Sequence, residues 1–510
     1  MIDPASQQAA FDLLAHPSTY GGAKVTRMDT HAAAVFLAGD RAYKIKRAVK
    51  FPFLDFSTVP LRKAALEAEI EANRPFAPDL YLGLVPIVRR NSGLFLGGAG
   101  ETVDWVLKMR RFDETQTFDH LAAAGRIDVD LAAALARAVA TAHTRAPIVD
   151  AKMWIAAVGE YIAQNDVAFR EMPDLFPARD TASLTEESNE ALARLRPLLQ
   201  ARGAQGLVRR GHGDLHLGNI ALIDGAPVPF DALEFDPIVA AGDVLYDLAF
   251  LLMDLVERGL AAQANAVLNT YFIASRRAED IEALAALPLF LSLRAAIRAK
   301  VTASKGEHAD GAKRDTIFKE AKAYFALACR LITPRPPVLI AVGGLSGTGK
   351  SVLARGLAPY IMPEPGALVL RSDIERKAMF GVAETDKLPP EAYTPEVAQR
   401  LYHTLTDKAG RVVAAGHSAI VDAVFSKPAE RALVEQAARD RHVAFHGLFL
   451  DADLATRIAR VGGRVNDASD ADTKIAQSQE DYDLGNVEWH QVDASGTPEQ
   501  TLHTARVLLR

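Results

Sequence analysis

The stretch that most limits the folds open to this chain is GGLSGTGKS, residues 343–351, which fits the pattern Gly-x-x-x-x-Gly-Lys-Ser/Thr. Its glycines allow successive backbone N–H groups to point toward one spot, and a helix N-terminus behind them adds further donors for phosphate oxygens. The apolar run VLIAVGG precedes the loop, and a helical pattern follows from Lys350. The segment therefore predicts a strand, a phosphate-binding loop and a helix in direct succession.

The key polar positions of this loop have expected tasks. Lys350 would reach the β- and γ-phosphates of a nucleoside triphosphate, and the Ser351 hydroxyl would bind Mg²⁺. A chance match on a glycine-rich turn is the alternative, which the strand before the loop and the helix after it disfavour. The residues predicted to bind the nucleotide phosphates are Gly344, Ser346, Gly347, Thr348, Gly349, Lys350 and Ser351.

Two carboxylates end apolar strand-like runs in the same part of the chain. Asp422 in SAIVDA is a candidate Mg²⁺ ligand that acts through a bound water, and the alternative is a strand-end cap. Asp373 in LVLRSDIERK is a candidate base that accepts a proton from a substrate hydroxyl. The same residue also fits a helix cap, and the two roles are compatible.

Several arginines nearby are candidates to neutralise the charge of the transferred phosphoryl group. Arg457 and Arg460 are spaced to share one helix face. A solvated surface charge is the alternative for each of them. The candidates are Arg376, Arg457, Arg460 and Arg464, of which Arg457 and Arg464 are our predicted phosphate ligands.

Strand-like and helical segments alternate from residue 338 to the end of the chain, which predicts a parallel sheet with helices on both faces. The motifs GLSGTGKS, RSDIERK and IVDAVF make this part resemble small P-loop kinases of the gluconate kinase, chloramphenicol phosphotransferase and zeta-toxin type. Bacteriophage polynucleotide kinase has a similar arrangement. The resemblance implies ATP binding and leaves the acceptor open.

The proline-rich stretch TPRPPV, residues 333–338, marks an expected domain boundary. Proline lacks the backbone N–H and clashes with the preceding helical turn, so a helix cannot continue through it. We expect a first domain over residues 1–332, a linker over 333–337 and a second domain over 338–510. Within the first domain, a small β-rich lobe is expected over about residues 1–112 and a helical lobe over about 113–332.

The first domain contains the second strong pattern, RRGHGDLHLGNIAL at residues 209–222. A phosphotransferase needs a carboxylate near the acceptor hydroxyl and a nearby amide oxygen on Mg²⁺. Asp214 and Asn219 on a tight loop meet that need, and Asp231 after the next apolar strand supplies a metal-binding carboxylate. An ordinary turn is the alternative for the tripeptide HGD taken alone.

At these residues the chain resembles the aminoglycoside phosphotransferase and choline kinase superfamily, which has the protein-kinase-like fold. The resemblance implies that Asp214 is the catalytic base, Asn219 a Mg²⁺ ligand and Asp231 the main metal carboxylate. The resemblance also implies that His212 stabilises the loop and takes no part in the chemistry. Glu234 and Asp236 are second choices as metal ligands. Asp243 and Asp247 are expected to brace the loop, with substrate binding as the alternative.

The same resemblance requires a lysine for the α- and β-phosphates and a glutamate that orients it. RAYKIK places Lys44 and Lys46 on one strand face, and the family pattern favours Lys44. Glu69 on the following helical segment is the expected ion-pair partner, and Glu67 is the alternative. A solvated lysine on an edge strand is the competing interpretation of Lys44.

Two further nucleotide contacts are less clearly marked. Trp105–Met109 is expected at the hinge, where its backbone would bond the adenine edge. No Gly-x-Gly-x-x-Gly pattern precedes Lys44, and MDTHAAAVF occupies the place of the phosphate-covering loop. Thr30 and His31 are the candidates there.

The composition of the whole chain limits the classes of partner that we expect for the protein. The net charge of −6 over 510 residues disfavours nucleic acid, which attracts basic surfaces. The single cysteine, Cys329, cannot form an internal disulfide. The sequence shows neither a signal peptide nor the run of ~20 apolar residues that crosses a membrane. We therefore expect a cytoplasmic protein, and the sequence does not specify its oligomeric state.

Both halves together resemble a two-domain bacterial family in which an aminoglycoside-phosphotransferase-like domain is fused to a P-loop AAA-type ATPase or kinase domain. The expected fold class is α/β and α+β: a bilobal protein-kinase-like domain, then a P-loop kinase-like domain with a parallel sheet. The expected function is transfer of the γ-phosphoryl group of ATP, with Mg²⁺, to a hydroxyl of a small molecule at two distinct sites. The alternatives are a nucleotide-switched regulatory ATPase, or a P-loop domain that acts on nucleic-acid 5′ ends or nucleotide sugars.

Overall fold

The computed structural model describes residues 4–51, 54–90, 93–234, 239–463 and 468–509. Two candidates named above, Asp236 and Arg464, lie outside these residues. The chain divides into two compact units, which are Met1–Glu160 with Leu199–Asp254 and Tyr161–Leu198 with Leu255–Arg510. The helices that contribute to both units are α5 (Ala151–Glu171), α6 (Ala178–Ala204) and α7 (Val244–Glu257).

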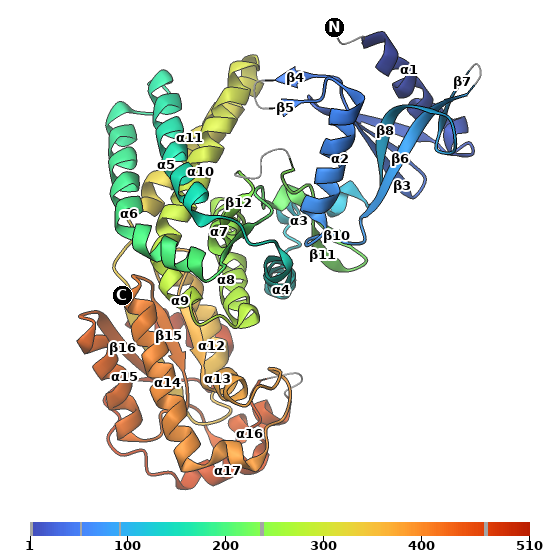
Figure 1. The fold of residues 1–510 in the computed structure, drawn as a ribbon. Coiled ribbons are helices and arrows are strands. Elements are labelled where there is room, and N and C mark those ends of the chain that lie inside the picture. The colour runs from blue at the N-terminus through green and yellow to red at the C-terminus, as the bar shows by residue number, and fades with distance from the viewer. Residues whose placement is uncertain (1–3, 52–53, 91–92, 235–238, 464–467, 510) are drawn as a thin grey trace. The chain divides into compact units, whose positions relative to one another are not determined.

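A six-stranded antiparallel sheet of order β1-β2-β3-β8-β6-β7 forms the core of the first unit (Figure 1). Its strands are β1 (Val25–Asp29), β2 (Ala33–Ala38), β3 (Arg41–Lys46), β6 (Tyr81–Arg90), β7 (Gly93–Leu96) and β8 (Glu101–Arg110). The β2–β3 hairpin turns at Gly39, whose φ of 57° suits a tight turn. This hairpin pairs Val35 with Lys44.

Helices pack against both faces of this sheet. On one face α1 packs Phe11 against Phe36, and on the other face α2 packs Leu66 against Leu107. The β10–β11 hairpin of the same unit begins directly after Asn219. The remaining elements of this unit are α1 (Pro4–Ala15), β4 (Lys50–Phe51), β5 (Leu54–Asp55), α2 (Val59–Asn73), α3 (Phe118–Ala123), α4 (Val129–Arg145), β9 (Val208–Arg210), β10 (Ile220–Ile223), β11 (Ala226–Pro229) and β12 (Ala241–Asp243).

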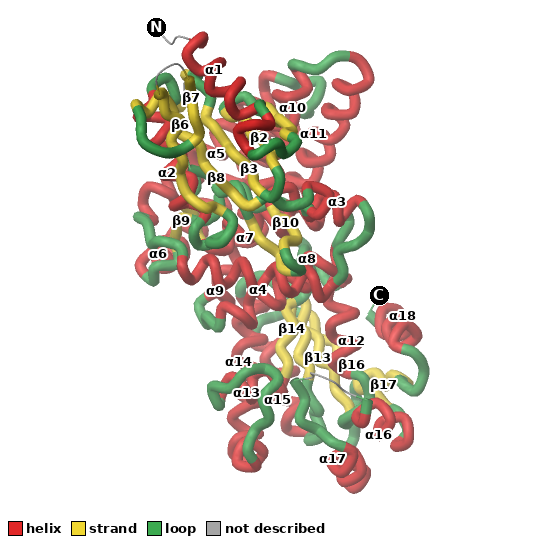
Figure 2. The backbone as a smooth tube through the Cα atoms, turned by 90° about the vertical axis from the view of Figure 1, so that its right-hand side faces the viewer, coloured by secondary structure: helices red, strands yellow, loops and turns green. Residues whose placement is uncertain are grey.

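A five-stranded sheet of order β14-β15-β13-β16-β17 forms the core of the second unit, and every neighbouring pair is parallel (Figure 2). Its strands are β13 (Val338–Gly344), β14 (Leu368–Arg371), β15 (Ala419–Asp422), β16 (Ala444–Asp451) and β17 (His490–Asp493). The helices are α8 (Ala261–Ser275), α9 (Asp280–Ala283), α10 (Leu287–Glu307), α11 (Gly311–Ile332), α12 (Lys350–Leu357), α13 (Ser372–Met379), α14 (Pro395–Ala414), α15 (Pro428–Asp440), α16 (Leu454–Gly462), α17 (Thr473–Ser478) and α18 (Pro498–Leu508). No helix among the described residues is both long and apolar enough to cross a membrane.

Alternate residues of the central strand β13 pack against different helices, as a sheet covered on both faces requires. Ile340 and Val342 belong to the core that α12 and α18 complete, while α14 and α15 also contact β13. The parallel register places Asp422 beside Val342 on one side and beside Arg371 on the other. Ligands of such sheets bind outside the carboxyl ends of the strands, which is where the phosphate loop and Asp422 meet. The fold class predicted from the sequence is confirmed.

Helix α8 closes the free edge of the parallel sheet at β14. Val369 N–H donates a hydrogen bond of 2.7 Å to Asn269 Oδ1, and Asn269 Nδ2 donates one of 3.2 Å to the Ala367 carbonyl. Asn265 Nδ2 donates to the same carbonyl at 3.0 Å. The helices before the proline-rich stretch and the sheet after it therefore pack as one unit, and the domain bounds expected from that stretch stay a prediction.

Candidate active sites

Glycines set the path of the loop between β13 and α12. Gly344, Gly347 and Gly349 have φ angles of 134°, 87° and 95°, which side chains rarely adopt. A Cβ atom at Gly347 would lie 2.5 Å from the Arg457 carbonyl oxygen, and one at Gly344 would lie 2.6 Å from the Leu450 carbonyl oxygen. The loop is thus held close to β16 and α16, and only glycine fits at these two contacts.

The polar side chains of the loop make local contacts. Lys350 Nζ donates a hydrogen bond of 3.0 Å to the Leu345 carbonyl, and Thr348 Oγ1 donates one of 2.8 Å to the same oxygen. Arg371 Nη2 donates to Ser351 Oγ at 3.2 Å. The sequence-predicted phosphate residues are thereby gathered at the carboxyl end of β13.

Two carboxylates lie at the ends of the neighbouring strands. Asp422 ends β15, and its Oδ2 is 3.3 Å from Arg371 Nε. Asp373 stands in the first turn of α13, directly after β14. Burial raises the pKa of the Asp373 carboxyl, and the negative charge of Asp422 raises it further against the opposing charges of Arg371 and Lys350.

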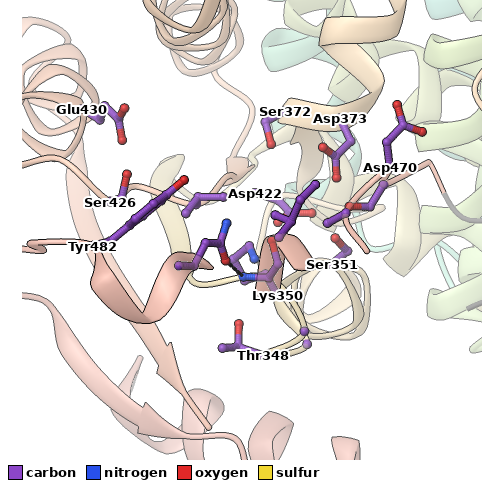
Figure 3. A pocket seen from close by; sticks show the side chains of 18 of the residues that line it. Thr348, Lys350, Ser351, Ser372, Asp373, Asp422, Ser426, Glu430, Asp470 and Tyr482 are labelled. Atoms are coloured by element: carbon purple, nitrogen blue, oxygen red, sulfur yellow. Dashed lines mark hydrogen bonds between the residues drawn. The ribbon is translucent and has the colours of Figure 1, made fainter. Parts of the chain in front are cut away.

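One cavity of about 950 Å³ joins these groups, and it is lined by Lys350, Ser351, Asp373 and Asp422. Figure 3 shows Ser351, Asp373 and Asp422 on one side of Lys350, with Glu430 on the other. Hydroxyl and carboxylate oxygens are the ligands that Mg²⁺ prefers. The donor set of Ser351 and Asp422 therefore fits a magnesium ion, and the glycine loop beside it fits an anion.

The candidate arginines differ in what they contact. Arg376 and Arg460 line the cavity, and each donates a hydrogen bond to a backbone carbonyl, that of Ala392 at 2.6 Å and that of Gly496 at 2.8 Å. Arg457 is only 2% exposed, and its Nε donates to the Ser346 carbonyl at 2.9 Å. The contact of Arg457 with a phosphate stays a prediction.

In the first unit, the two lysines of β3 form a network of ion pairs with three carboxylates. Lys44 Nζ is 2.7 Å from Glu69 Oε1 and 2.9 Å from Asp231 Oδ1. Lys46 Nζ is 2.7 Å from Glu69 Oε2 and 2.6 Å from Glu234 Oε1. Burial opposes the charge of Lys44, but Asp231 and Glu69 outweigh it and hold the pKa of Lys44 well above its ordinary value. The charge of Lys44 in turn lowers the pKa of Asp231.

The segment RRGHGDLHLGNIAL, which carries the predicted base Asp214, forms a compact turn. Asn219 Nδ2 donates hydrogen bonds of 3.0 Å to both the backbone carbonyl and Oδ2 of Asp214. Phe230 N–H donates to the Asn219 carbonyl at 2.8 Å, which brings the start of the Asp231 segment against the loop. Asp214 and Asn219 therefore share one turn, and the backbone bond of Phe230 to Asn219 joins the residue before Asp231 to that turn. The roles of all three residues as base and metal ligands remain predictions.

Buried acidic residues brace this turn from α7. Asp247 accepts hydrogen bonds from the backbone N–H groups of His212 at 2.8 Å and Gly213 at 2.9 Å. His143 Nε2 lies 3.0 Å from Asp247 Oδ2. Burial lowers the pKa of His212, whose Nε2 lies 2.9 Å from the Phe230 carbonyl oxygen. These contacts match the bracing alternative for His212 and Asp247.

A second cavity, of about 550 Å³, lies beside the end of β8 and is lined by Met28, Leu37 and Arg111–Thr115. The hinge expected at Trp105–Met109 is corrected here, because Leu107–Met109 lie inside β8 and pair with β3 and β6.

Thr30 closes the β1–β2 turn, since its N–H and hydroxyl both donate to the Ala33 carbonyl.

Sequence reasoning missed two contacts at these sites. It assigned Glu234 only to the metal, whereas the carboxylate pairs with Lys46. It gave no role to Gln479, whose Oε1 accepts the Ser346 N–H at 2.7 Å. No local motif marks either contact, because the partners are 188 and 133 residues apart.

The phosphate loop, the parallel sheet and the strand-end carboxylates define the C-terminal part as a P-loop domain, and a family model described as an AAA domain matches residues 339–482. An uncharacterized protein of Mycobacterium tuberculosis is 30% identical over 491 residues, covering 94% of this chain and 94% of that protein. An uncharacterized protein of Mycobacterium bovis matches to the same extent. The chain therefore belongs to the family of these mycobacterial proteins.

Among the solved structures that resemble parts of the chain are a protein of a kinase family and a kinase. The choline/ethanolamine kinase family protein of Mesorhizobium loti is 15% identical, with 64% of this chain and 99% of that chain covered and a TM-score of 0.36. The APS kinase of Mycobacterium tuberculosis, solved with AMPPNP and APS, is 19% identical, with 35% and 100% covered and a TM-score of 0.28.

Proposed function

We propose that the protein is an ATP-dependent phosphotransferase with two separate ATP sites, each of which transfers the γ-phosphoryl group to a hydroxyl of a small molecule. The observation that carries this proposal is the single cavity in which Lys350 and Ser351 meet Asp373 and Asp422. An anion-binding loop beside strand-end carboxylates provides both the positioning and the proton acceptor that phosphoryl transfer to a hydroxyl needs.

At the site in the second unit, the loop N–H groups and Lys350 bind the triphosphate. Asp373 accepts the proton of the acceptor hydroxyl. At the same time the hydroxyl oxygen bonds to the γ-phosphorus, and the bond from that phosphorus to ADP breaks. Ser351 and Asp422 would hold a magnesium ion, which would supply positive charge against the phosphate oxygens. The position of Asp373 in the first turn of α13, in the wall of the cavity that the phosphate loop also lines, supports this role.

At the site in the first unit, the supporting observations are the Lys44–Glu69 ion pair and the Asp214–Asn219 hydrogen bond. Lys44 binds phosphate oxygens, Glu69 orients it, and Asp214 accepts the hydroxyl proton. The Asn219 amide oxygen and the Asp231 carboxylate form a donor set that suits Mg²⁺.

A screen for phosphoryl transfer tests this function. Wild-type protein is incubated with γ-labelled ATP, Mg²⁺ and a panel of sugars, aminoglycosides and alcohols, and labelled products are separated and counted. We expect at least one labelled acceptor, and we expect excess chelator to abolish its formation. Tight ATP binding without transfer to any acceptor would favour a nucleotide-switched regulator instead. Labelling of a 5′-hydroxyl oligonucleotide alone would replace the small-molecule assignment of the P-loop domain.

A further inference from the structure

The backbone of Ser346 in the phosphate loop is held on both sides by two buried side chains from distant parts of the chain. Its N–H donates a hydrogen bond of 2.7 Å to Gln479 Oε1, and its carbonyl accepts one of 2.9 Å from Arg457 Nε. Gln479 is 5% exposed and Arg457 is 2% exposed. Both peptide groups that flank Ser346 are therefore fixed in orientation by buried side chains.

All three nitrogens of the Arg457 guanidinium contact oxygen atoms of the protein. Its Nη2 donates to the Ala476 carbonyl at 3.0 Å and to Gln479 Oε1 at 3.4 Å, and its Nη1 pairs with Glu480. A planar guanidinium has five N–H donors in a fixed fork, so these partners and Ser346 set both its position and its direction. Arg457 could reach a phosphate only by giving up these bonds.

The backbone of Arg457 also lies against the loop. The position of a Cβ atom on Gly347 is 2.5 Å from the Arg457 carbonyl oxygen and 2.8 Å from its Cα atom. The contact leaves no room for the loop to move toward α16. Three contacts, from Gln479, the Arg457 side chain and the Arg457 backbone, thus converge on Ser346 and Gly347.

We propose that Gln479 and Arg457 are positioning residues that hold the phosphate loop in its anion-binding shape before ATP arrives. A loop whose N–H groups are already oriented loses little conformational entropy on binding and binds more tightly for that reason. The same segment supplies Ser478 and Tyr482 to the cavity wall, so the brace joins the loop to that wall. This inference rests on the proposed ATP binding by the loop.

The decisive variants are Gln479→Met, which keeps the side-chain length but removes the acceptor, and Arg457→Lys, which keeps the charge but removes the fork. The exposed Gln477→Met, two residues away on α17, is the matched control. ATP affinity is measured on the full chain by titration calorimetry. Because we propose two ATP sites, the binding that Lys350→Ala removes is taken as binding to the phosphate loop. The KM for ATP and kcat are measured on the acceptor found in the screen.

We expect Gln479→Met and Arg457→Lys each to raise the dissociation constant and KM for ATP about tenfold, with kcat at saturating ATP little changed. The double variant should lose less than the product of the two effects, because both residues act on Ser346. A variant that merely unfolds in part would instead lose kcat with KM unchanged. Gln477→Met should match the wild type.

Two results would overturn the inference. ATP affinity unchanged within twofold in Gln479→Met would remove the positioning role, and tighter binding would make Gln479 a competitor of phosphate for the Ser346 N–H. Both are distinct from failure of the proposed function, in which Lys350→Ala itself leaves ATP binding and transfer unaltered.

Discussion

Lys44 Nζ lies 2.7 Å from Glu69 Oε1, and the Glu69 side chain is completely buried. The second carboxylate oxygen of Glu69 is 2.7 Å from Lys46 Nζ, so one buried anion holds two lysines of the same strand. Lys44 also contacts Asp231, the expected metal carboxylate. The pair therefore links the expected phosphate-binding lysine to the expected metal site.

Lys44→Met should weaken the reaction of the first unit at the nucleotide step. The variant removes the cation that binds phosphate oxygens, while Lys46 still neutralises Glu69 and preserves the fold. We expect kcat/KM for ATP to fall about 100-fold, as when one charged donor of a transition state is lost. Steady-state kinetics on the acceptor of this site measure the loss. An equal loss from the exposed Lys50→Met control would contradict the prediction.

Asp214→Asn should separate chemistry from binding in the first unit. Asparagine can accept the Asn219 hydrogen bond but is far too weak a base to take the hydroxyl proton. We expect kcat to fall about 100- to 10,000-fold with the KM for ATP within threefold of wild type. A variant that keeps its kcat would remove Asp214 from the role of base.

Asn269→Ala should loosen the edge of the parallel sheet. Val369 N–H donates to Asn269 Oδ1 at 2.7 Å, and loss of the acceptor leaves this N–H without that partner. The cost is ~1–3 kcal/mol, or roughly 10- to 100-fold faster exchange of that amide. Hydrogen-exchange mass spectrometry of the β14 peptide measures it. Asn269→Asp keeps the acceptor for Val369 but loses the donor to Ala367, so it should retain more protection than Asn269→Ala. Equal exchange in wild type and Asn269→Ala would contradict the prediction.

Stability should depend on pH through His417. Burial lowers the pKa of this imidazole from 6.5 to about 4, and its Nε2 lies 2.9 Å from the Gly366 carbonyl oxygen. Between these two pH values the unfolded chain binds more protons than the folded chain, so stability rises with pH across the window. The contribution approaches ~1.4 kcal/mol per pH unit there.

Denaturant unfolding between pH 4 and pH 6.5 checks this dependence. His417→Gln should shallow the slope of unfolding free energy against pH, while the exposed His503→Gln should not. An identical slope in wild type and His417→Gln would show that His417 does not titrate differently on unfolding.

The strands and the phosphate loop could be predicted because their signals are local. Apolar runs bounded by glycine and aspartate mark the five parallel strands, and the GGLSGTGKS pattern marks the loop and helix after the first of these strands. Lys44 and Glu69 came from a resemblance that names a lysine on a strand and a glutamate on the next helix. Their contact needed only the hairpin and α2 to form as expected.

The remaining contacts depend on tertiary packing and leave no local trace. Gln479 reaches Ser346 from 133 residues away, and Asn269 reaches Val369 from 100 residues away. The hinge was misplaced because Trp105–Met109 continues an apolar strand pattern, and periodicity does not mark where a strand leaves its sheet. Such features become visible only when the packed structure is known.

The most direct test of two separate sites compares phosphoryl transfer by wild type, Asp214→Asn, Lys350→Ala and the double variant on one panel of acceptors with γ-labelled ATP and Mg²⁺. We predict that each single variant loses one distinct part of the wild-type transfer and keeps the other, and that the double variant keeps at most about 1% of the transfer. Full transfer in either single variant, or a substantial fraction of the wild-type transfer left in the double variant, would contradict the proposal of two separate sites.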